Sequence, residues 1–366
     1  MEIQEFDKNF RNLFPDEQTG IVWHDVRCPP FALYGLYCPE TEPTLHRMPR
    51  EAAARVSDGV AALERHTSGG RLRFSTNSPY IALRMRAPSF TRFSHMPLGG
   101  TAGFDLYIDD DGIYSFVNTF RPDPKTLSEG YTSAIDMSAL NYGEGWHSFT
   151  VNLPLYNAVD EFQIGIRPGY EVGPGRTYRD LPPIVYYGSS ITQGGCASRP
   201  GNAYPNIISR RLDMDFLNLG FSGQAKGQRE LAEYIATLDM SLFVLDYDHN
   251  APSPAHLEAS HYAFYEVIRS QQPTLPILMV SRPDVPQRNA QVPLRRAIVR
   301  SSYERAIAAG DRYVRHIDGA DLFAGEEWWD CTVDGTHPND LGFRRMADVI
   351  GAQVAAILKI DPAKRR

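Results

Sequence analysis

The stretch IVYYGSSITQGG, Ile184 to Gly195, decides the fold of this chain. A short apolar run, rich in β-branched and aromatic residues, passes directly into Gly188, two serines and a turn that ends in two glycines. This composition predicts a buried strand followed by a sharp turn. The turn has two interpretations: an ordinary exit from a sheet, or a turn that presents Ser190 for chemistry. Partners elsewhere in the chain distinguish the two.

The residues after this stretch repeat its pattern. Short apolar runs alternate with segments in which apolar residues recur every three to four positions, as in a helix. The predicted strands lie at 183–188, 216–221, 242–248, 276–281 and 313–318, and the predicted helices at 202–213, 228–239, 256–271, 293–310 and 341–359. Regular alternation of strand and helix predicts a parallel sheet with helices on both faces. In such a sheet, a ligand site forms at the carboxyl ends of the strands.

In the first part of the chain, apolar and polar residues alternate instead, so that every second residue is apolar. Alternating runs at 71–77, 80–86, 103–120, 147–155 and 160–168 predict strands. The Asp111-Gly112 pair predicts a hairpin, and segment 50–66 is locally helical with an interruption at VSDG. Strands at this spacing predict an antiparallel, jelly-roll-like β-sandwich, followed by a connector rich in glycine and proline. We therefore predict two domains, residues 1–180 and residues 181–366.

Chemically active residue types follow the predicted strands and precede the last helix. The four segments are GSSIT (188–192), NLGFSG (218–223), DYDHN (246–250) and DGTHPN (334–339). Acyl transfer needs a serine activated by an imidazole, a carboxylate that orients the imidazole, and fixed N–H donors for the oxyanion. Together the four segments supply such a set.

In their order along the chain, YYGSSITQG, NLGFSG, DYDHN and DGTHPND resemble the motifs of the SGNH or GDSL-type serine hydrolases. The resemblance covers roughly the second half of the chain and implies a flavodoxin-like three-layer α/β/α domain. It implies a catalytic set with Ser190 as nucleophile, His337 as general base and Asp334 as the partner that orients the base. It also implies an oxyanion hole built by the backbone N–H groups of Ser190 and Gly223 and the side-chain amide of Asn250.

Two motifs depart from the usual pattern of that family. Ser189 stands where the family usually has aspartate, at a position without a catalytic role in the family's scheme. In the third motif, Asp248 stands where the family has glycine, and an alanine follows Asn250. Two of the donors also have structural interpretations: Gly223 as a turn glycine, and Asn250 as a cap of the following helix.

Three further residues are candidates for substrate contact. Arg282 follows the fourth predicted strand, so we expect it at the same edge of the sheet as the four motifs. The alternative role is an ion pair with Asp284 or another acid. Trp328, together with Trp329, is either a stacking wall for a sugar or aromatic acyl group or part of the core. His249 is expected to line the pocket rather than to act as the base.

The composition excludes several other classes of protein. The net charge of −7 shows no overall excess of basic residues of the kind that nucleic-acid-binding proteins carry. The chain has no apolar run long enough to span a bilayer and no apolar signal core at its start, so we expect a cytoplasmic protein without a membrane partner. The four scattered cysteines form no CxxC pair and have no close histidine partners in sequence, so we expect no metal. No cofactor is expected, and the oligomeric state is not predicted.

The sequence therefore predicts a serine esterase that works through an acyl-enzyme. A β-sandwich ahead of such a domain resembles an arrangement among carbohydrate esterases, which implies a small acyl ester, preferably acetyl, on a sugar or oligosaccharide. Two alternatives stay open. The same site serves an acyltransferase if another alcohol replaces water, and the chain is a glycan-binding protein if its hydrolase site is vestigial.

Overall fold

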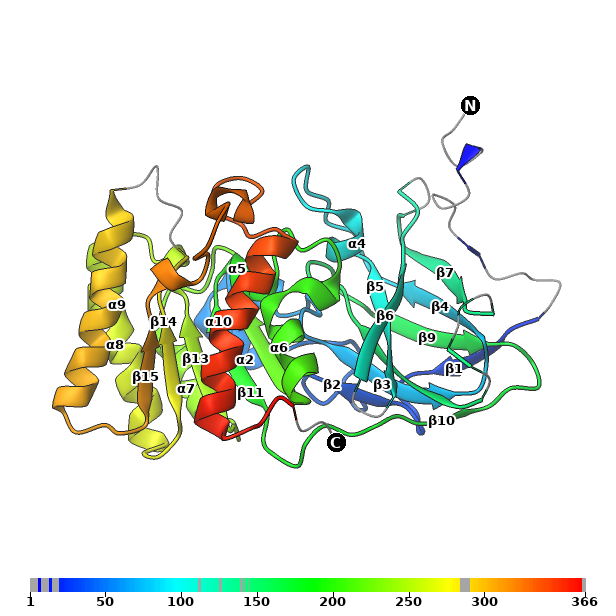
Figure 1. The fold of residues 1–366 in the computed structure, drawn as a ribbon, viewed down its shortest axis with the longest axis horizontal. Helices are drawn as coiled ribbons and strands as arrows, with labels where there is room; N and C mark the ends of the chain where they lie inside the picture. Colours follow the sequence, from blue (N-terminus) through cyan, green and yellow to red (C-terminus); the bar gives the residue numbers. More distant parts are fainter. Residues whose placement is uncertain are drawn as a thin grey trace.

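The computed structural model describes residues 6–7, 13–14, 20–110, 113–124, 127–138, 140, 142–143, 145–283 and 290–363. An antiparallel β-sandwich and a parallel α/β domain lie side by side along the longest axis (Figure 1). Among the described residues, no helix combines the length and the apolar character needed to cross a bilayer.

The parallel sheet confirms the predicted alternation of strands and helices. Its five strands are β11 (Ile184–Gly188), β12 (Phe216–Gly220), β13 (Leu242–Asp246), β14 (Ile277–Val280) and β15 (Val314–Ile317). They are ordered β12-β11-β13-β14-β15, and all neighbours are parallel. In this flavodoxin-like order the direction of the connections changes between β11 and β13, where ligands bind in such sheets. The switch point therefore borders the strand that leads into Ser190.

Helices cover both faces of this sheet, as predicted for a three-layer α/β/α domain. One face carries α6 (Tyr204–Leu212) and α10 (Asp340–Leu358), and the other carries α7 (Arg229–Ala236), α8 (Pro254–Gln271) and α9 (Gln291–Ala308). Successive residues of a strand point to opposite faces. Accordingly, Tyr186 and Val244 pack toward α6 and α10, whereas Val185 and Leu245 pack toward the other helices.

The N-terminal part is a two-sheet antiparallel sandwich, which confirms the predicted class. The first sheet has the order β1 (Val22–Asp25), β9 (Glu161–Ile166), β4 (Tyr80–Arg86), β7 (Gly130–Asp136). The second has the order β10 (Val172–Pro174), β3 (Arg71–Thr76), β8 (His147–Asn152), β5 (Phe104–Asp110), β6 (Ile113–Phe120), with β2 (Ala32–Tyr34) also paired to β3. A core that includes Phe74, Leu83 and Phe104 fills the space between the sheets. The predicted Asp111-Gly112 turn lies outside the described residues, although β5 and β6 pair on either side of it.

The predicted helical segment 50–66 forms two helices, α2 (Arg50–Val56) and α3 (Asp58–Leu63). Ser57 separates them and caps α3, because its side chain accepts a 3.2 Å hydrogen bond from the Val60 N–H. Ala53 and Val60 belong to the same apolar core as Val185 of the parallel sheet. These helices thus pack in space with the α/β domain, and a boundary near residue 180 stays a prediction.

Candidate active site

Ser190 lies directly after β11, as the first residue of helix α5 (Ser190–Gln193). Ser189 caps this helix, since its side chain accepts a 3.2 Å hydrogen bond from the Ile191 N–H. Serine and aspartate are both favoured at this capping position. A Cβ atom at Gly188 would collide with Thr192 and with the carbonyl of Asp246, so only glycine fits where the strand turns into the helix. The departure at residue 189 therefore preserves the turn that presents Ser190.

The structure brings Ser190, His337 and Asp334 together in one chain of hydrogen bonds. The Ser190 Oγ atom lies 2.9 Å from Nε2 of His337, and Nδ1 of His337 lies 2.7 Å from Oδ2 of Asp334. His337 and Asp334 lie in the turn just before α10, where Gly335 has a φ of +83° that favours glycine. The spacing of three residues thus places the imidazole between the serine and the carboxylate.

Asp334 is held as a carboxylate in this arrangement. Its partial burial acts to raise its pKa, but hydrogen bonds from the backbone and imidazole of His337 outweigh burial and lower the pKa below its ordinary value. The second oxygen, Oδ1, accepts the backbone N–H groups of Thr336 at 3.0 Å and His337 at 2.8 Å. A fixed negative charge therefore faces Nδ1 of His337 and orients its ring.

Three groups near Ser190 are available as hydrogen-bond donors. The N–H of Ser190 belongs to the first turn of α5, where helix geometry provides no acceptor. Gly223 has a φ of +69°, and its N–H has no partner among the described residues. The Asn250 amide donates to the carbonyl of Phe221 at 2.9 Å, which leaves its second N–H for another acceptor. Ser253, rather than Asn250, caps α8 by accepting from the His256 N–H at 3.1 Å.

Gln193 links the serine turn to the segment that carries Gly223, and sequence reasoning missed it. Its Oε1 accepts the Ser222 N–H at 3.0 Å, and its Nε2 donates to the carbonyl of Leu155 at 3.0 Å. Nε2 also lies 3.0 Å from Nδ1 of His66, whose pKa is lowered to about 3 by burial. A neutral His66 accepts a hydrogen bond from the amide, so the orientation of Gln193 is fixed. Its position within the GSSITQG motif was the sequence feature that could have identified Gln193.

The β-sandwich also reaches the serine, through residues that the sequence did not single out. Tyr156, between β8 and β9, donates a 3.1 Å hydrogen bond to the carbonyl of Ser190. Segment 88–97, between β4 and α4 (Leu98–Thr101), adds two rings. The ring of Phe93 meets that of Tyr156 edge to face at 5.7 Å, and the ring centroid of His95 lies 5.9 Å from that of His337. The two domains thus share one site.

The loop that follows α5 is anchored in the sandwich by the stretch GFDLY, Gly103 to Tyr107. Asp105 is fully buried and accepts hydrogen bonds from the Gly201 N–H and from Arg199, both at 2.8 Å. Asn152 donates to the same carboxylate at 2.7 Å. These bonds satisfy a buried charge and fix the chain nine to eleven residues after Ser190.

The structure gives the three predicted substrate residues different surroundings. His249 is half-buried beside Arg282 and His337, and desolvation lowers its pKa well below the ordinary value, as expected of a neutral residue that lines the pocket. Arg282 is 9% exposed, and its backbone N–H donates to Asp248 at 3.0 Å. Its alternative partner Asp284 lies outside the described residues. Trp328 packs against the core beneath α10, which favours its interpretation as a core residue, whereas Trp329 is exposed.

Two buried carboxyl groups lie behind the serine turn. Asp246, the last residue of β13, accepts hydrogen bonds from the hydroxyls of Thr192 and Tyr204, both at 3.0 Å. Burial and the nearby charge of Asp248 raise the pKa of Asp246 to about 8. Burial likewise raises the pKa of Asp248 to about 6, although the N–H and charge of Arg282 act in the opposite direction. Asp246 is therefore largely protonated at neutral pH.

Cys196 lies in the turn after α5, close to the catalytic histidine. Burial, assisted by the charge of Asp334, raises the pKa of its thiol to about 12. The thiol is therefore uncharged at neutral pH and does not compete with Ser190 as a nucleophile. Among the described residues, donor atoms of His95, Cys196 and His337 lie within 4.8 Å of one another, a juxtaposition that sequence spacing did not predict.

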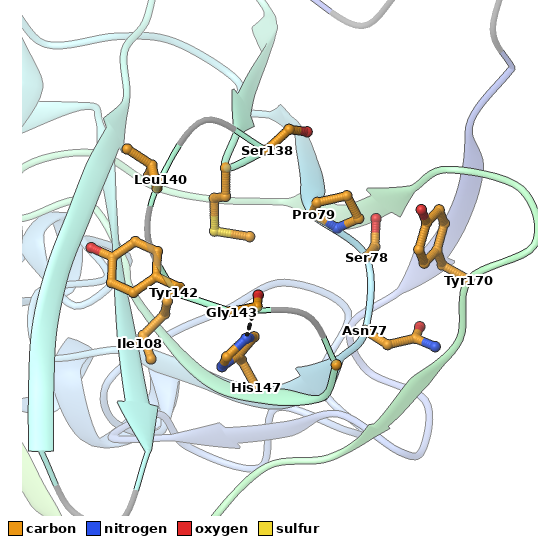
Figure 2. A pocket seen from close by; sticks show the side chains of 12 residues that line it. Asn77, Ser78, Pro79, Ile108, Ser138, Leu140, Tyr142, Gly143, His147 and Tyr170 are labelled. Carbon is orange, nitrogen blue, oxygen red and sulfur yellow. Dashed lines mark hydrogen bonds between the residues drawn. The ribbon is translucent and has the colours of Figure 1, made fainter.

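A separate pocket of about 600 Å³ opens in the β-sandwich (Figure 2). Tyr142 and Tyr170 lie on opposite sides of it in this view, with His147 between them, where Nε2 of His147 lies 3.4 Å from the carbonyl oxygen of Gly143. It is lined by residues 77–79, 108, 137–138, 140, 142–143, 145, 147 and 170, none of which is in the hydrogen-bonded set around Ser190. The pocket is thus distinct from the candidate active site.

A flavodoxin-like α/β domain with a serine–histidine–aspartate chain at its switch point defines a carboxylic ester hydrolase. Residues 182–355 match the profile of the GDSL-like lipase/acylhydrolase family, and residues 21–172 match the profile of the N-terminus of SGNH-hydrolase-type esterases, named for the GxDLY motif. Residues 182–355 therefore form a domain of the GDSL-like lipase/acylhydrolase family, preceded by the N-terminal domain of SGNH-hydrolase-type esterases.

Solved structures resemble the chain over nearly its whole length. A GDSL-like lipase from Bacteroides ovatus is 28% identical with a TM-score of 0.83, covering 93% of this chain and 99% of that one. The salicylyl-acyltransferase SsfX3 of a tetracycline biosynthetic pathway is 21% identical with a TM-score of 0.75, covering 94% and 99%. A family two carbohydrate esterase from Clostridium thermocellum, in complex with cellohexaose, is 13% identical with a TM-score of 0.54, covering 93% and 99%. No curated protein sequence matches the chain.

Proposed function

We propose that the protein is a serine esterase that removes a small acyl group, preferably acetyl, from a carbohydrate. The observation that carries this proposal is the distance of 2.9 Å between Ser190 Oγ and His337 Nε2, with Asp334 on the far side of the same ring. An uncharged serine hydroxyl becomes a useful nucleophile when an oriented imidazole takes its proton. This geometry needs no metal or organic cofactor.

In the proposed reaction, Ser190 Oγ attacks the ester carbonyl carbon while Nε2 of His337 takes the hydroxyl proton. The negative charge that develops on the carbonyl oxygen is stabilised by the N–H groups of Ser190 and Gly223 and by the free N–H of the Asn250 amide. The intermediate then collapses, His337 gives its proton to the leaving alcohol, and an acyl-enzyme forms. Water, deprotonated by His337, attacks this ester, and the acid leaves as Ser190 recovers its proton.

The surroundings of Ser190 support a small acyl group. Ser190 is only 8% exposed, so only a small part of this residue is accessible to an ester. Phe93 and His95 further enclose the site, because their rings lie beside Tyr156 and His337. The proposal of a carbohydrate as the alcohol part is supported by the similarity of the whole two-domain chain to a carbohydrate esterase that binds cellohexaose.

An acyltransferase would use the same residues, with an acceptor alcohol in place of water. The similarity to a salicylyl-acyltransferase is the observation that keeps this second function open. The two functions differ in product, so they are separated by measuring how the acyl-enzyme partitions between water and added sugar alcohols.

The test is hydrolysis of 4-nitrophenyl esters and of acetylated oligosaccharides by wild type and Ser190→Ala. We expect acetate release by the wild type, faster turnover of acetyl than of long acyl esters, and loss of activity in the variant. Ser270→Ala, which removes a hydroxyl bonded within α8, is the matched control and should retain activity. Better turnover of long acyl chains would remove the deacetylase proposal. An inert wild type that binds glycan, with binding preserved in Ser190→Ala, would instead establish a binding protein with a vestigial site.

A further inference from the structure

Three nitrogen and sulfur donors converge beside the catalytic histidine from segments far apart in the sequence. Donor atoms of His95, Cys196 and His337 lie within 4.8 Å of one another. His95 comes from the sandwich segment ahead of α4, Cys196 from the turn after α5, and His337 from the turn before α10. The cluster therefore exists only when the two domains are assembled.

Two of the three residues are held in place by packing. Cys196 is 4% exposed and has a φ of +73°, a conformation that residues other than glycine rarely adopt. Its neighbour Gly195 lies against His337, because a Cβ atom there would be 3.3 Å from the Cδ2 atom of that ring. His95 is exposed, so its side chain has room to adjust toward the other two.

Thiolate and imidazole are the ligands that zinc prefers. Zinc binds sulfur at about 2.3 Å and imidazole nitrogen at about 2.0–2.1 Å in tetrahedral geometry, which separates neighbouring donors by roughly 3.5 Å. Donors within 4.8 Å reach that spacing through a shift of about 1 Å, which rotation of the exposed His95 side chain can supply. Two histidines and one cysteine leave a fourth position for water.

We propose that His95, Cys196 and His337 form a zinc site whose occupation inhibits the enzyme. Binding releases the Cys196 thiol proton to solvent and forms a zinc–thiolate bond. Both ring nitrogens of His337 have a partner in the metal-free protein: Nε2 serves Ser190, and Nδ1 serves Asp334. Zinc at Nε2 prevents proton transfer from Ser190, and zinc at Nδ1 displaces Asp334. Inhibition rests on the proposed esterase function, whereas binding of the metal does not.

Binding is tested on the full chain after treatment with a chelator. Zinc is titrated against a chromophoric competitor, and cobalt(II) serves as a spectroscopic substitute that reports a thiolate ligand by its charge-transfer absorption. We expect one equivalent bound to the wild type and to Ser190→Ala. Cys196→Ser should lose the thiolate absorption, and both Cys196→Ser and His95→Gln should weaken zinc binding by at least about 10- to 100-fold.

Cys38→Ser is the matched control, because it removes an exposed thiol outside the cluster and should bind zinc as the wild type does. Equal zinc affinity of wild type, Cys196→Ser and His95→Gln would overturn the site. Zinc bound through these residues without loss of ester hydrolysis would overturn the inhibition. An inactive wild type that still shows the cobalt–thiolate absorption would contradict the proposed function and leave the metal site established.

Discussion

Tyr156 of the β-sandwich donates a 3.1 Å hydrogen bond to the backbone carbonyl oxygen of Ser190. Gly194 and Gly195 donate their N–H groups to the same oxygen, at 3.0 and 2.8 Å. One carbonyl therefore joins the serine turn, the loop that follows it and the other domain. Since Tyr156 is buried, its hydroxyl has no solvent to replace this acceptor. The relationship predicts that the sandwich supports catalysis by fixing the backbone of the nucleophile.

Tyr156→Phe should lower kcat for a small ester by about 3- to 10-fold, the equivalent of one neutral hydrogen bond. Its KM should change little, because the hydroxyl contacts the backbone of Ser190 rather than the ester. Steady-state kinetics with 4-nitrophenyl acetate measures both constants. Tyr142→Phe removes a hydroxyl of the same domain at the separate pocket and should behave as the wild type (Figure 2). Equal kcat for Tyr156→Phe and wild type would show that the bond does not support the reaction.

Asp334→Asn should lower kcat by about 10³- to 10⁴-fold, because an amide no longer holds His337 in the tautomer that accepts the serine proton. The carboxylate of the wild type is lost only below the ordinary aspartate pKa, since hydrogen bonds from His337 lower the pKa of Asp334. The kcat of the wild type should therefore show no titration of Asp334 above about pH 4. Asp361→Asn changes a carboxylate near the C-terminus and serves as the control. Near-normal turnover by Asp334→Asn would assign the orienting role to another group.

Asp105→Ala should destabilise the protein by about 3 kcal/mol or more, because it leaves Arg199, largely buried, and the Gly201 N–H without their acceptor. The loss should also lower activity, since the unanchored loop begins a few residues after Ser190. Thermal unfolding and ester hydrolysis measure the two effects. Glu129→Ala, in the same domain, removes an exposed ion pair with Arg86 and should cost less than about 1 kcal/mol. Similar costs for the two variants would contradict the anchoring role of Asp105.

The sequence was sufficient to predict the α/β domain because a local pattern of apolar residues marks each of its strands and helices. The alternation of apolar runs with helical periods marks every strand of the parallel sheet, and the residues at strand ends follow from it. Ser190, Asp334 and His337 lie in short motifs, so their convergence follows from the sheet topology. The sandwich was predicted as a class, but β1, β2, β7 and β10 were missed, and β2 and β10 are only three residues long.

Contacts made by irregular loops could not be predicted in the same way. Tyr156, His95 and Phe93 lie on connections of the sandwich, where no period shows which side chain faces another domain. Their proximity to Ser190 and His337 depends on how the two domains pack. The packing of α2 and α3 on the parallel sheet has the same origin, because their apolar faces do not show which core they join.

The buried carboxyl group of Asp246 predicts how stability depends on pH. Its pKa is raised to about 8 from an ordinary value of 3.8, so the folded protein binds more protons than the unfolded chain between these values. Stability contributed by this group is therefore present at low pH and is lost as pH rises from about 4 to about 8. Asp248, whose pKa is raised to about 6, acts in the same direction.

Asp246→Asn should remove part of this slope, because an amide keeps an acceptor for Tyr204 and Thr192 but does not ionise. Histidines with a lowered pKa, such as His66, contribute the opposite slope. The test is therefore a difference: the free energy of unfolding of the wild type in urea, relative to that of the variant, should decrease between pH 5 and pH 8. Asp348→Asn, which changes an exposed carboxylate on α10, should keep the wild-type slope. A variant with the same slope as the wild type would mean that Asp246 is already ionised in the folded protein. In that case the hydroxyls of Thr192 and Tyr204 stabilise a buried carboxylate behind the serine turn, and Asp246→Asn should lower stability by the same amount throughout pH 5 to 8.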